Sequence, residues 1–356
     1  MLSYIARRLA LIPLTLLGII TLNFLIVQVA PSGPVERVLA QVKGLDPRAT
    51  QAARTSAPAT NAGAYRGAQG LDPAFIKDLE RQFGFDKPAH ERFARMIGNY
   101  LTFDLGQSFY RSIGVGELIL EKMPVSISIG LWSTLLIYLI SIPLGIAKAV
   151  RDGTTWDVAT SYLVVVGYAV PPFLFAVVLI VLFAGGSYLD WFPLRGLTSE
   201  NWQALSPMGK IADYFWHLAL PVAALTVGGF AALTMLTKNS FLDEINKQYV
   251  ITARAKGLTE KRVLYGHIFR NAMLLVIAGI PATLVSMLFT GAVLIEVIFS
   301  LDGLGLLAYQ ATLDRDYPVI FGDLYVFSLA GLLLNLLSDV LYHVVDPRID
   351  FESRAT

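Results

Sequence analysis

Long apolar runs separated by short polar segments dominate the chain. The first run, Leu9–Ala30, has 22 residues and no charged side chain. A helix that crosses a bilayer needs about 20 mostly apolar residues. Similar runs recur at Val125–Ala147, Val158–Gly186, Trp216–Thr237, Ala272–Phe299 and Pro318–Val345. The pattern predicts an all-α polytopic membrane protein with six transmembrane helices.

The first run is predicted to be a retained span. The apolar core of a secretory signal is roughly 7–15 residues long and precedes a small-residue cleavage site. Here the run is longer, and Pro31 follows Ala30 where cleavage would fall.

Lysine and arginine are unevenly distributed between the two sides of these six spans. If the N-terminus lies inside, the inner segments hold 13 Lys and Arg residues, whereas the short outer loops hold only Arg195, Lys210 and Arg315. Cytoplasmic loops carry an excess of Lys and Arg, and long loops do not count in this rule. Both termini are therefore predicted to be cytoplasmic.

This topology divides the chain into four parts. They are the tail with span one (1–30), an outer, periplasmic segment (31–122), the transmembrane core (123–345) and a cytoplasmic tail (346–356).

The outer segment is predicted to contain a flexible insert and two helices. Residues 45–70 are rich in Ala, Thr, Ser, Gly and Gln and show no apolar period, which indicates flexibility. Asp72 is a plausible N-cap before Pro73, and Gly84 ends that helix. The second helix has an apolar stripe at helical spacing, formed by Phe93, Met96, Ile97, Tyr100 and Leu101. Two interpretations are compatible: a helical cap that buries its stripes, and a docking platform for a soluble partner.

Composition agrees with a membrane protein and removes several chemistries. The chain of 356 residues is 55% hydrophobic and 15% charged, whereas soluble domains carry about a quarter charged residues. Its net charge of +1 offers no field that would attract nucleic acid. There is no cysteine, and the four histidines are scattered, so neither a metal site nor another cofactor is predicted.

The cytoplasmic loop at 238–271 contains the segment YVITARAKGL, Tyr249–Leu258. Ser240, with an acid three residues later, resembles a capping box that would begin a helix there. Gly257 is predicted to end that helix, because glycine enters the left-handed region at no steric cost. Thr259 then caps a second helix, with Glu260 at its positive end. The basic charges allow a loop on the lipid surface, and the small residues allow a close protein contact.

The loop resembles that of permease subunits of bacterial ABC importers, in the dipeptide and oligopeptide branch. That branch reads much like Y-x-x-T-A-R-A-K-G-L followed by R-N-A-L. The resemblance covers nearly the whole chain and includes these segments: PSGP (31–34), FGFDKP (83–88), FDLGQS (103–108), IPLGI (142–146), EVIFSLDGLG (296–305), RDYPV (315–319) and DPR (346–348). Within the branch, the likeness is greatest to importers of peptides and of the peptide–nucleotide antibiotic microcin C. Two departures are Ile251, where the family usually has an acid, and Leu275, where proline is common.

The resemblance implies a type I ABC importer permease that works by alternating access. Its partners would be a second permease in a heterodimer, ABC ATPase subunits, a periplasmic peptide-binding protein, a peptide substrate and the lipid bilayer of the bacterial inner membrane. The chain has no Gly-x-x-x-x-Gly-Lys-[Ser/Thr] loop, so ATP hydrolysis is expected on another chain. The residues that match the family's coupling loop are Tyr249, Thr252, Ala253, Arg254, Ala255, Lys256, Gly257 and Leu258.

Acids and prolines within the spans are candidates for a gate or pathway. Intramembrane acids are functional candidates by default, and Glu296, Asp323 and Asp339 lie in or near spans. The alternative for Asp339 is that it reaches the cytoplasmic interface. Pro171 and Pro172 break the third span, either as a packing bend or as a hinge.

Two other classes of protein are compatible with a polytopic chain. A secondary transporter would show inverted repeats and acids near the bilayer midplane, but the acids here lie near span ends. An intramembrane enzyme has little support, since no midplane Ser/His or Asp/Asp pair is present. Within the importer class, nickel chelates and glutathione are alternatives to peptides.

Overall fold

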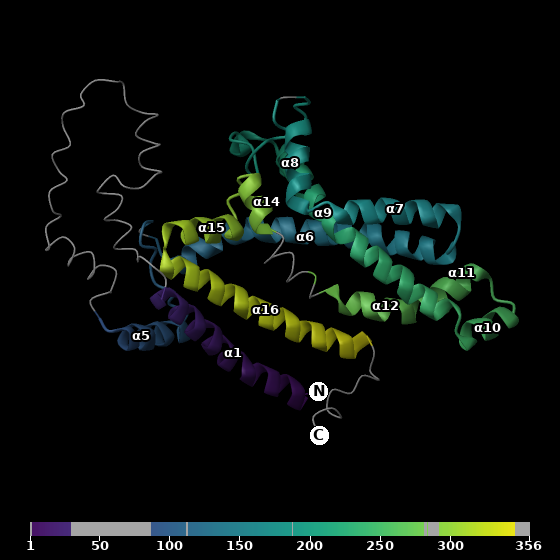
Figure 1. Ribbon diagram of the computed structural model, residues 1–356, viewed down its shortest axis with the longest axis horizontal. Helices are drawn as coiled ribbons and strands as arrows, with labels where there is room; N and C mark the ends of the chain where they lie inside the picture. The colour runs from purple at the N-terminus through teal and green to yellow at the C-terminus, as the bar shows by residue number, and fades with distance from the viewer. Residues whose placement is uncertain are drawn as a thin grey trace. The chain divides into compact units, whose positions relative to one another are not determined.

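The computed structural model describes residues 2–29, 87–111, 113–186, 188–280, 283 and 292–345, and these residues are predominantly helical (Figure 1). An isolated β-bridge joins Gln107 to Gly114. The helices are α1 Leu2–Val29, α5 Ala89–Leu101, α6 Val115–Val150, α7 Thr155–Ala169, α8 Pro172–Phe183, η1 Trp202–Ala204, α9 Pro207–Ile245, α10 Gln248–Ala255, α11 Glu260–Val263, η2 Leu264–Ile268 (a π-helix), α12 Phe269–Ala278, α14 Ala292–Ile298, α15 Leu304–Asp314 and α16 Tyr317–Val345.

Four of the described helices are long and apolar enough to cross a membrane: α1, α6, α9 and α16. The pair α7 and α8 would make a fifth span if it counts as one. The expected fifth span, Ala272–Phe299, is represented by α12 and α14, but residues 281–282 and 284–291 lie outside the described residues. The count of six spans therefore stays a prediction.

The predicted break at Pro171–Pro172 is confirmed, and it is sharper than a kink. The axes of α7 and α8 differ by 92°. Pro171 is the N-cap of α8 with extended backbone angles (φ −58°, ψ 135°), and Pro172 is the first helical residue. A proline disfavours helical geometry in the residue before it, while its own fixed φ suits the first turn of a new helix. The apolar run Val158–Gly186 is thus two helices rather than one.

The start predicted at Ser240 for the helix in the 238–271 loop is wrong. Helix α9 runs without interruption from Pro207 to Ile245, so Ser240 lies inside it and caps nothing. The N-cap of α9 is Ser206, whose side chain accepts a hydrogen bond from Gly209 N at 3.1 Å. Capping signals are local, and a long apolar face that packs against other helices keeps the chain helical through such a signal.

Of the two helices predicted between residues 31 and 122, one lies in the described residues and is present as α5. α5 covers the apolar stripe; its Tyr100 is buried, whereas Leu101 is 73% exposed and does not belong to the buried face. The helix predicted from Asp72 to Gly84 and the insert at 45–70 lie outside the described residues.

The chain forms two compact units. The first comprises Met1–Ile12, Glu121–Leu307 and Phe327–Thr356, and the second Pro13–Leu120 and Ala308–Val326. In the second unit, Ser108 and Asp316 are both buried, and the Ser108 hydroxyl donates to Asp316 Oδ2 at 2.5 Å.

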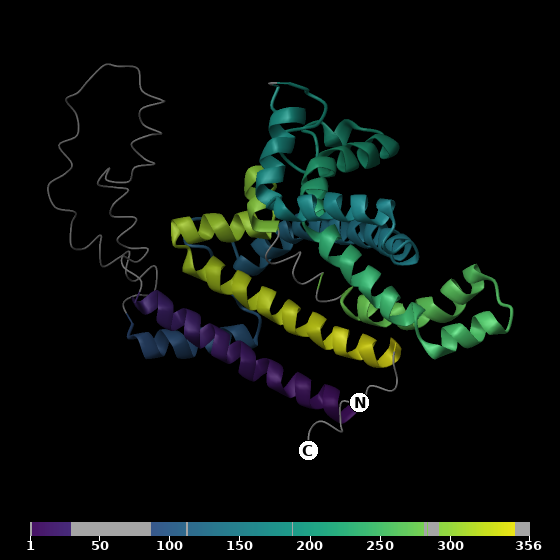
Figure 2. The same ribbon diagram turned by 45° about the vertical axis from the view of Figure 1, so that its right-hand side comes forward.

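The first unit contains α7 to α12. In it, α6 and α7 form a hairpin that α9 crosses (Figures 1 and 2). One of its apolar clusters contains Phe241 of α9, Val250 and Ala253 of α10, and Val263 of α11. This cluster fixes α10 and α11 against the end of α9.

Candidate coupling loop and buried polar contacts

The junction between α9 and α10 is held by a shared carboxylate. Glu244, in the last turn of α9, accepts hydrogen bonds from the Lys247 ammonium and from the Tyr249 hydroxyl, the latter at 2.5 Å. Burial and the hydrogen bond to Glu244 raise the pKa of Tyr249. Tyr249, the tyrosine of the family motif, thus links α10 to the last turn of α9.

Helix α10 has an inner and an outer face. Val250 and Ala253 are 0% and 6% exposed and pack in the apolar cluster. The opposite face is exposed, and its members follow the spacing of a helical stripe. They are Gln248, Ile251, Thr252 and Ala255.

The turn after α10 requires glycine, as predicted. Gly257 has φ +77°, and no atom lies within 4 Å of where its Cβ would be, so the backbone angle and not crowding selects it. Its N–H donates to Arg254 O at 2.9 Å. Thr259 occupies the N-cap position of α11, but its side chain makes no capping hydrogen bond.

Arg254 pairs within the loop rather than pointing freely at a partner. Its Nε and one terminal nitrogen donate to the two carboxylate oxygens of Glu260, at 2.9 and 3.1 Å. This two-pronged contact joins α10 to α11 across the Gly257 turn, and forked pairs of this kind add geometric specificity. The side chains of Arg254 and Glu260 are 40% and 73% exposed, so this ion pair contributes little to stability.

The eight residues predicted for coupling thus separate into two groups. Exposed residues are Thr252, Arg254, Ala255, Lys256 and Gly257. Tyr249 and Leu258 are half-buried, and Ala253 faces the core of its own chain. Ala253 therefore serves the fit of α10 against the bundle and is not open to another surface.

Glu296 lies at the centre of a buried knot. Its side chain is 0% exposed and accepts from Ser126 Oγ at 2.6 Å and from Leu306 N at 2.9 Å. Ser126 in turn accepts from Leu304 N at 2.8 Å. A Cβ on Gly303 would lie 2.5 Å from Glu296 Oε2, which explains a glycine in the family segment here. The carboxylate fixes the turn before α15 to α6.

The other two acids occupy different surroundings. Asp339 forms an ion pair with Arg8 at 3.2 Å and accepts from the Tyr4 hydroxyl at 3.0 Å, all within the first unit. Asp323 is 3% exposed in the second unit, so it does not line an open surface of this structure.

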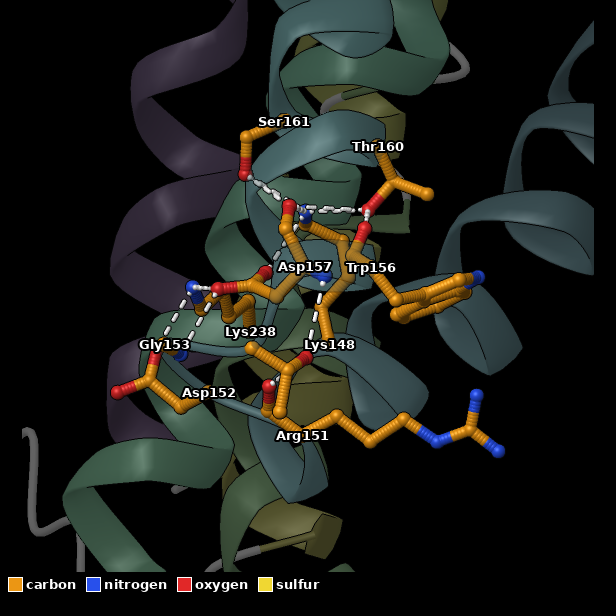
Figure 3. A network of polar contacts seen from close by, with 10 residues as sticks. Lys148, Arg151, Asp152, Gly153, Trp156, Asp157, Thr160, Ser161 and Lys238 are labelled. Carbon is orange, nitrogen blue, oxygen red and sulfur yellow. Dashed lines mark hydrogen bonds and ion pairs between the residues drawn. The ribbon is translucent and has the colours of Figure 1, made fainter.

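A buried charged cluster was not predicted as a site. We call Lys148, Asp152, Asp157 and Lys238 the charged cluster; Figure 3 shows both lysines turned toward Asp157. The sequence argument counted the lysines only as positive charges on the inner side. The sequence did contain one signal: each of Lys148, Asp157 and Lys238 directly borders an apolar run, and the first two flank one short turn.

Comparison with known proteins gives a consistent result. A family model described as "Binding-protein-dependent transport system inner membrane component" matches residues 141–351. The Escherichia coli O157:H7 protein "Inner membrane ABC transporter permease protein YejB" is 58% identical over 99% of this chain and 100% of that protein. The Agrobacterium fabrum protein "Peptidoglycan transport system permease protein YejB" is 57% identical over 99% of each. The Bacillus subtilis "Oligopeptide transport system permease protein AppB" is 34% identical over 99% of this chain and 100% of that protein.

The matches of these three relatives cover 99% of the chain, which includes the candidate coupling loop, Glu296 and the charged cluster. The resemblance inferred from motifs is confirmed. The chain belongs to the inner membrane components of binding-protein-dependent transport systems, the permease subunits of bacterial ABC importers.

Proposed function

We propose that this chain is the permease subunit of an ATP-driven importer that moves peptides from periplasm to cytoplasm by alternating access. It works with a second permease, with ABC ATPase subunits and with a soluble peptide-binding protein. Three relatives that match almost the full length of the chain are named as peptidoglycan, oligopeptide and dipeptide transport permeases, which supports this class of substrate.

The exposed face of α10 carries the proposal of ATPase coupling. The inner face of this short helix is buried, Glu244 ties its first turn to α9, and Gln248, Ile251, Thr252 and Ala255 remain outside. The outer stripe has one apolar side chain, Ile251, and small neighbours, so an ATPase groove can approach the backbone closely. An apolar contact at Ile251 replaces the acidic contact usual in the family.

Orientation follows from the charge distribution. The loop 238–271 carries the largest share of inner Lys and Arg residues, so we place it and both termini in the cytoplasm. The fifth span then crosses between Ala272 and Phe299, which completes six spans.

Gating is proposed to involve the acids and the broken span. Glu296 and Asp339 hold neighbouring segments together in this structure, and a gate would operate by changing such contacts. The bend at Pro171–Pro172 offers a joint between α7 and α8. Asp323 would meet a peptide amine only in a state in which its segment opens. Unchanged transport of cationic peptides by Asp323→Asn would refute that role.

A second candidate substrate is peptide released from peptidoglycan, because a relative of 57% identity is named for peptidoglycan transport. Microcin C-like conjugates, nickel chelates and glutathione are narrower alternatives. Competition distinguishes them: unlabelled oligopeptide, cell-wall peptide, glutathione or nickel chelate is added to a labelled-peptide uptake assay with the assembled importer. Failure of every peptide to be taken up or to compete would refute a peptide substrate.

The coupling role is tested by increasing side-chain volume on the outer face of α10. Ala255→Trp is expected to abolish peptide-dependent ATP hydrolysis and uptake, while the chain still folds, because position 255 is exposed. Ala94→Trp, at an exposed position of α5, is the matched control and should leave both activities near wild type. The purified complex is assayed for bound ATPase and for ATP hydrolysis.

Two results would contradict this proposal. One is that the purified chain carries no ATPase under conditions that preserve membrane complexes. The other is that Ala255→Trp and Ala94→Trp affect coupling equally, since α10 would then have no special role.

A further inference from the structure

Helices α6 and α9 contact each other along a continuous line near their cytoplasmic ends. At the first level, Ser141 Oγ donates to Phe230 O at 2.9 Å. One turn along α6, a Cβ on Gly145 would lie 2.6 Å from Thr237 Cβ and 2.8 Å from Thr234 O, so only glycine permits this approach. The glycine of the IPLGI segment therefore has a packing reason.

The charged cluster continues the same line by another turn. Lys148 Nζ contacts Asp157 Oδ1 at 2.9 Å, and Lys238 Nζ contacts Asp157 Oδ2 at 2.7 Å (Figure 3). Lys238 also reaches Asp152 Oδ1 at 2.8 Å. One carboxylate of α7 thus joins a lysine of α6 to a lysine of α9.

The partners of Lys148 leave its ammonium fully satisfied. Its side chain is 0% exposed and donates to Asp157 O, Thr160 Oγ1 and Ser161 Oγ at 2.7–2.9 Å. Asp157 also accepts from Gly153 N at 3.2 Å. Removing one member of a buried ion pair leaves an uncompensated charge, which is far more costly than the pair's net contribution.

We call these contacts the α6–α9 seam: Ser141, Gly145 and Lys148 on α6, with Phe230, Thr234, Thr237 and Lys238 on α9. The α6 members recur at i, i+4 and i+7, and those of α9 at i, i+4, i+7 and i+8, so each set lies on one helix face. Sliding along this seam would expose two lysines and bring Gly145 against bulkier atoms. We therefore expect the contacts of the α6–α9 seam to persist while α6 and α9 move together.

We propose that Asp157 is a positioning residue for transport. By holding Lys148 and Lys238 together, it fastens the α6–α7 hairpin to α9, the helix that continues into the coupling loop. A displacement of the loop then carries α6 and α7 with α9. The inference rests on the proposed function of the loop, and it assigns to the charged cluster the transmission of movement rather than contact with peptide or ATPase.

The first experiment separates transmission from folding. Asp157→Asn keeps the shape of the side chain but removes its charge. The assembled importer is expected to bind ATPase and hydrolyse ATP, while peptide uptake per ATP falls about 5- to 150-fold, the range typical of coupling between sites. Arg151→Gln is the matched control, because Arg151 lies in the same turn but extends away from Asp157, over the Trp156 ring (Figure 3). Its uptake per ATP is expected within about twofold of wild type, since exposed charges contribute little.

The second experiment replaces the ionic joint by a covalent one. The chain has no cysteine, so the double variant Asp152→Cys and Lys238→Cys contains a single cysteine pair. The two wild-type side chains at these positions form an ion pair. This variant should lose uptake per ATP, and a short bismaleimide that bridges the pair should restore most of it. If bridging instead abolishes the residual uptake, the seam must open during transport and the proposal is overturned. Unchanged uptake per ATP in Asp157→Asn would overturn it as well.

A third measurement does not depend on the substrate. Spin labels on Arg151→Cys and Asn246→Cys report the distance between the hairpin turn and the end of α9. That distance should be the same in the assembled importer with and without ATP, and should broaden when Asp157→Asn is added. A distance that changes with ATP in the otherwise wild-type chain refutes the closed seam. Absence of peptide transport with a constant distance would refute the proposed function and leave the seam in place.

Discussion

Replacing Gly145 by alanine tests the packing of α6 against α9. The added Cβ would meet Thr237 Cβ at 2.6 Å, Thr234 O at 2.8 Å and Thr237 Cγ2 at 2.9 Å. Carbon atoms that are not bonded prefer about 3.5–4.0 Å, so the two helices must separate by about 1 Å. The nearest atoms belong to backbone and to a β-branched side chain, and neither can rotate away.

The expected magnitude follows from two opposing effects. Overpacking a well-packed site costs about 1–3 kcal/mol. Alanine in place of glycine in a helix gains about 0.5–1 kcal/mol from the unfolded chain. We expect Gly145→Ala to lower the free energy of unfolding by up to about 2.5 kcal/mol, the largest difference between these effects. The charged side chains at the seam, Lys148, Asp157 and Lys238, should also become more accessible to solvent as the helices separate.

Gly98→Ala is the matched control, because Gly98 lies inside α5 and no atom is within 4 Å of its Cβ position. It should raise the free energy of unfolding by about 0.5–1 kcal/mol. Both variants are compared with wild type by reversible unfolding in mixed detergent micelles, and tryptophan fluorescence monitors the transition. A Gly145→Ala chain as stable as Gly98→Ala would refute the close approach of the two helices.

Three further predictions concern stability. Ser126→Ala removes the hydrogen bond to Glu296 Oε1 and the acceptor of the buried Leu304 N–H, although Glu296 Oε2 keeps its bond from Leu306 N, and it should cost about 2–3 kcal/mol. Ser128→Ala, which removes an exposed hydrogen bond to Pro124 O, should cost under about 0.5 kcal/mol. Thermal unfolding of both variants separates the two values. Ser300→Gly should stabilise by up to about 1 kcal/mol, since the residue has φ +48° and glycine has no penalty there; a lower midpoint would contradict this. A double-mutant cycle on Arg254 and Glu260 should give a coupling energy of about 0.2–1 kcal/mol that decreases as salt is added. A larger coupling energy that does not depend on salt would contradict the exposure of these two side chains.

The sequence by itself determined the class of protein and most of its helices. Runs such as Leu9–Ala30 are too long and apolar for a soluble protein, and in a bilayer the backbone must satisfy its own hydrogen bonds, which leaves helices. The break at Pro171–Pro172 and the turn at Gly257 were also predictable, because backbone chemistry fixes both locally. Family membership followed from short motifs with defined spacing.

Only the tertiary structure decided which face of each helix is buried and which other elements it contacts. Ser240 carries a local capping signal, but the packing of α9 overrides it. Ala253 and Ala255 are the same residue type two positions apart, yet one is buried and one exposed, because 200° of rotation separates them on a helix. Lys148 and Asp157 flank one short turn, but Lys238 lies 81 residues beyond Asp157, so its approach to them depends on how α9 crosses α6 and α7. Such contacts arise from long-range packing, which no local pattern of residues specifies.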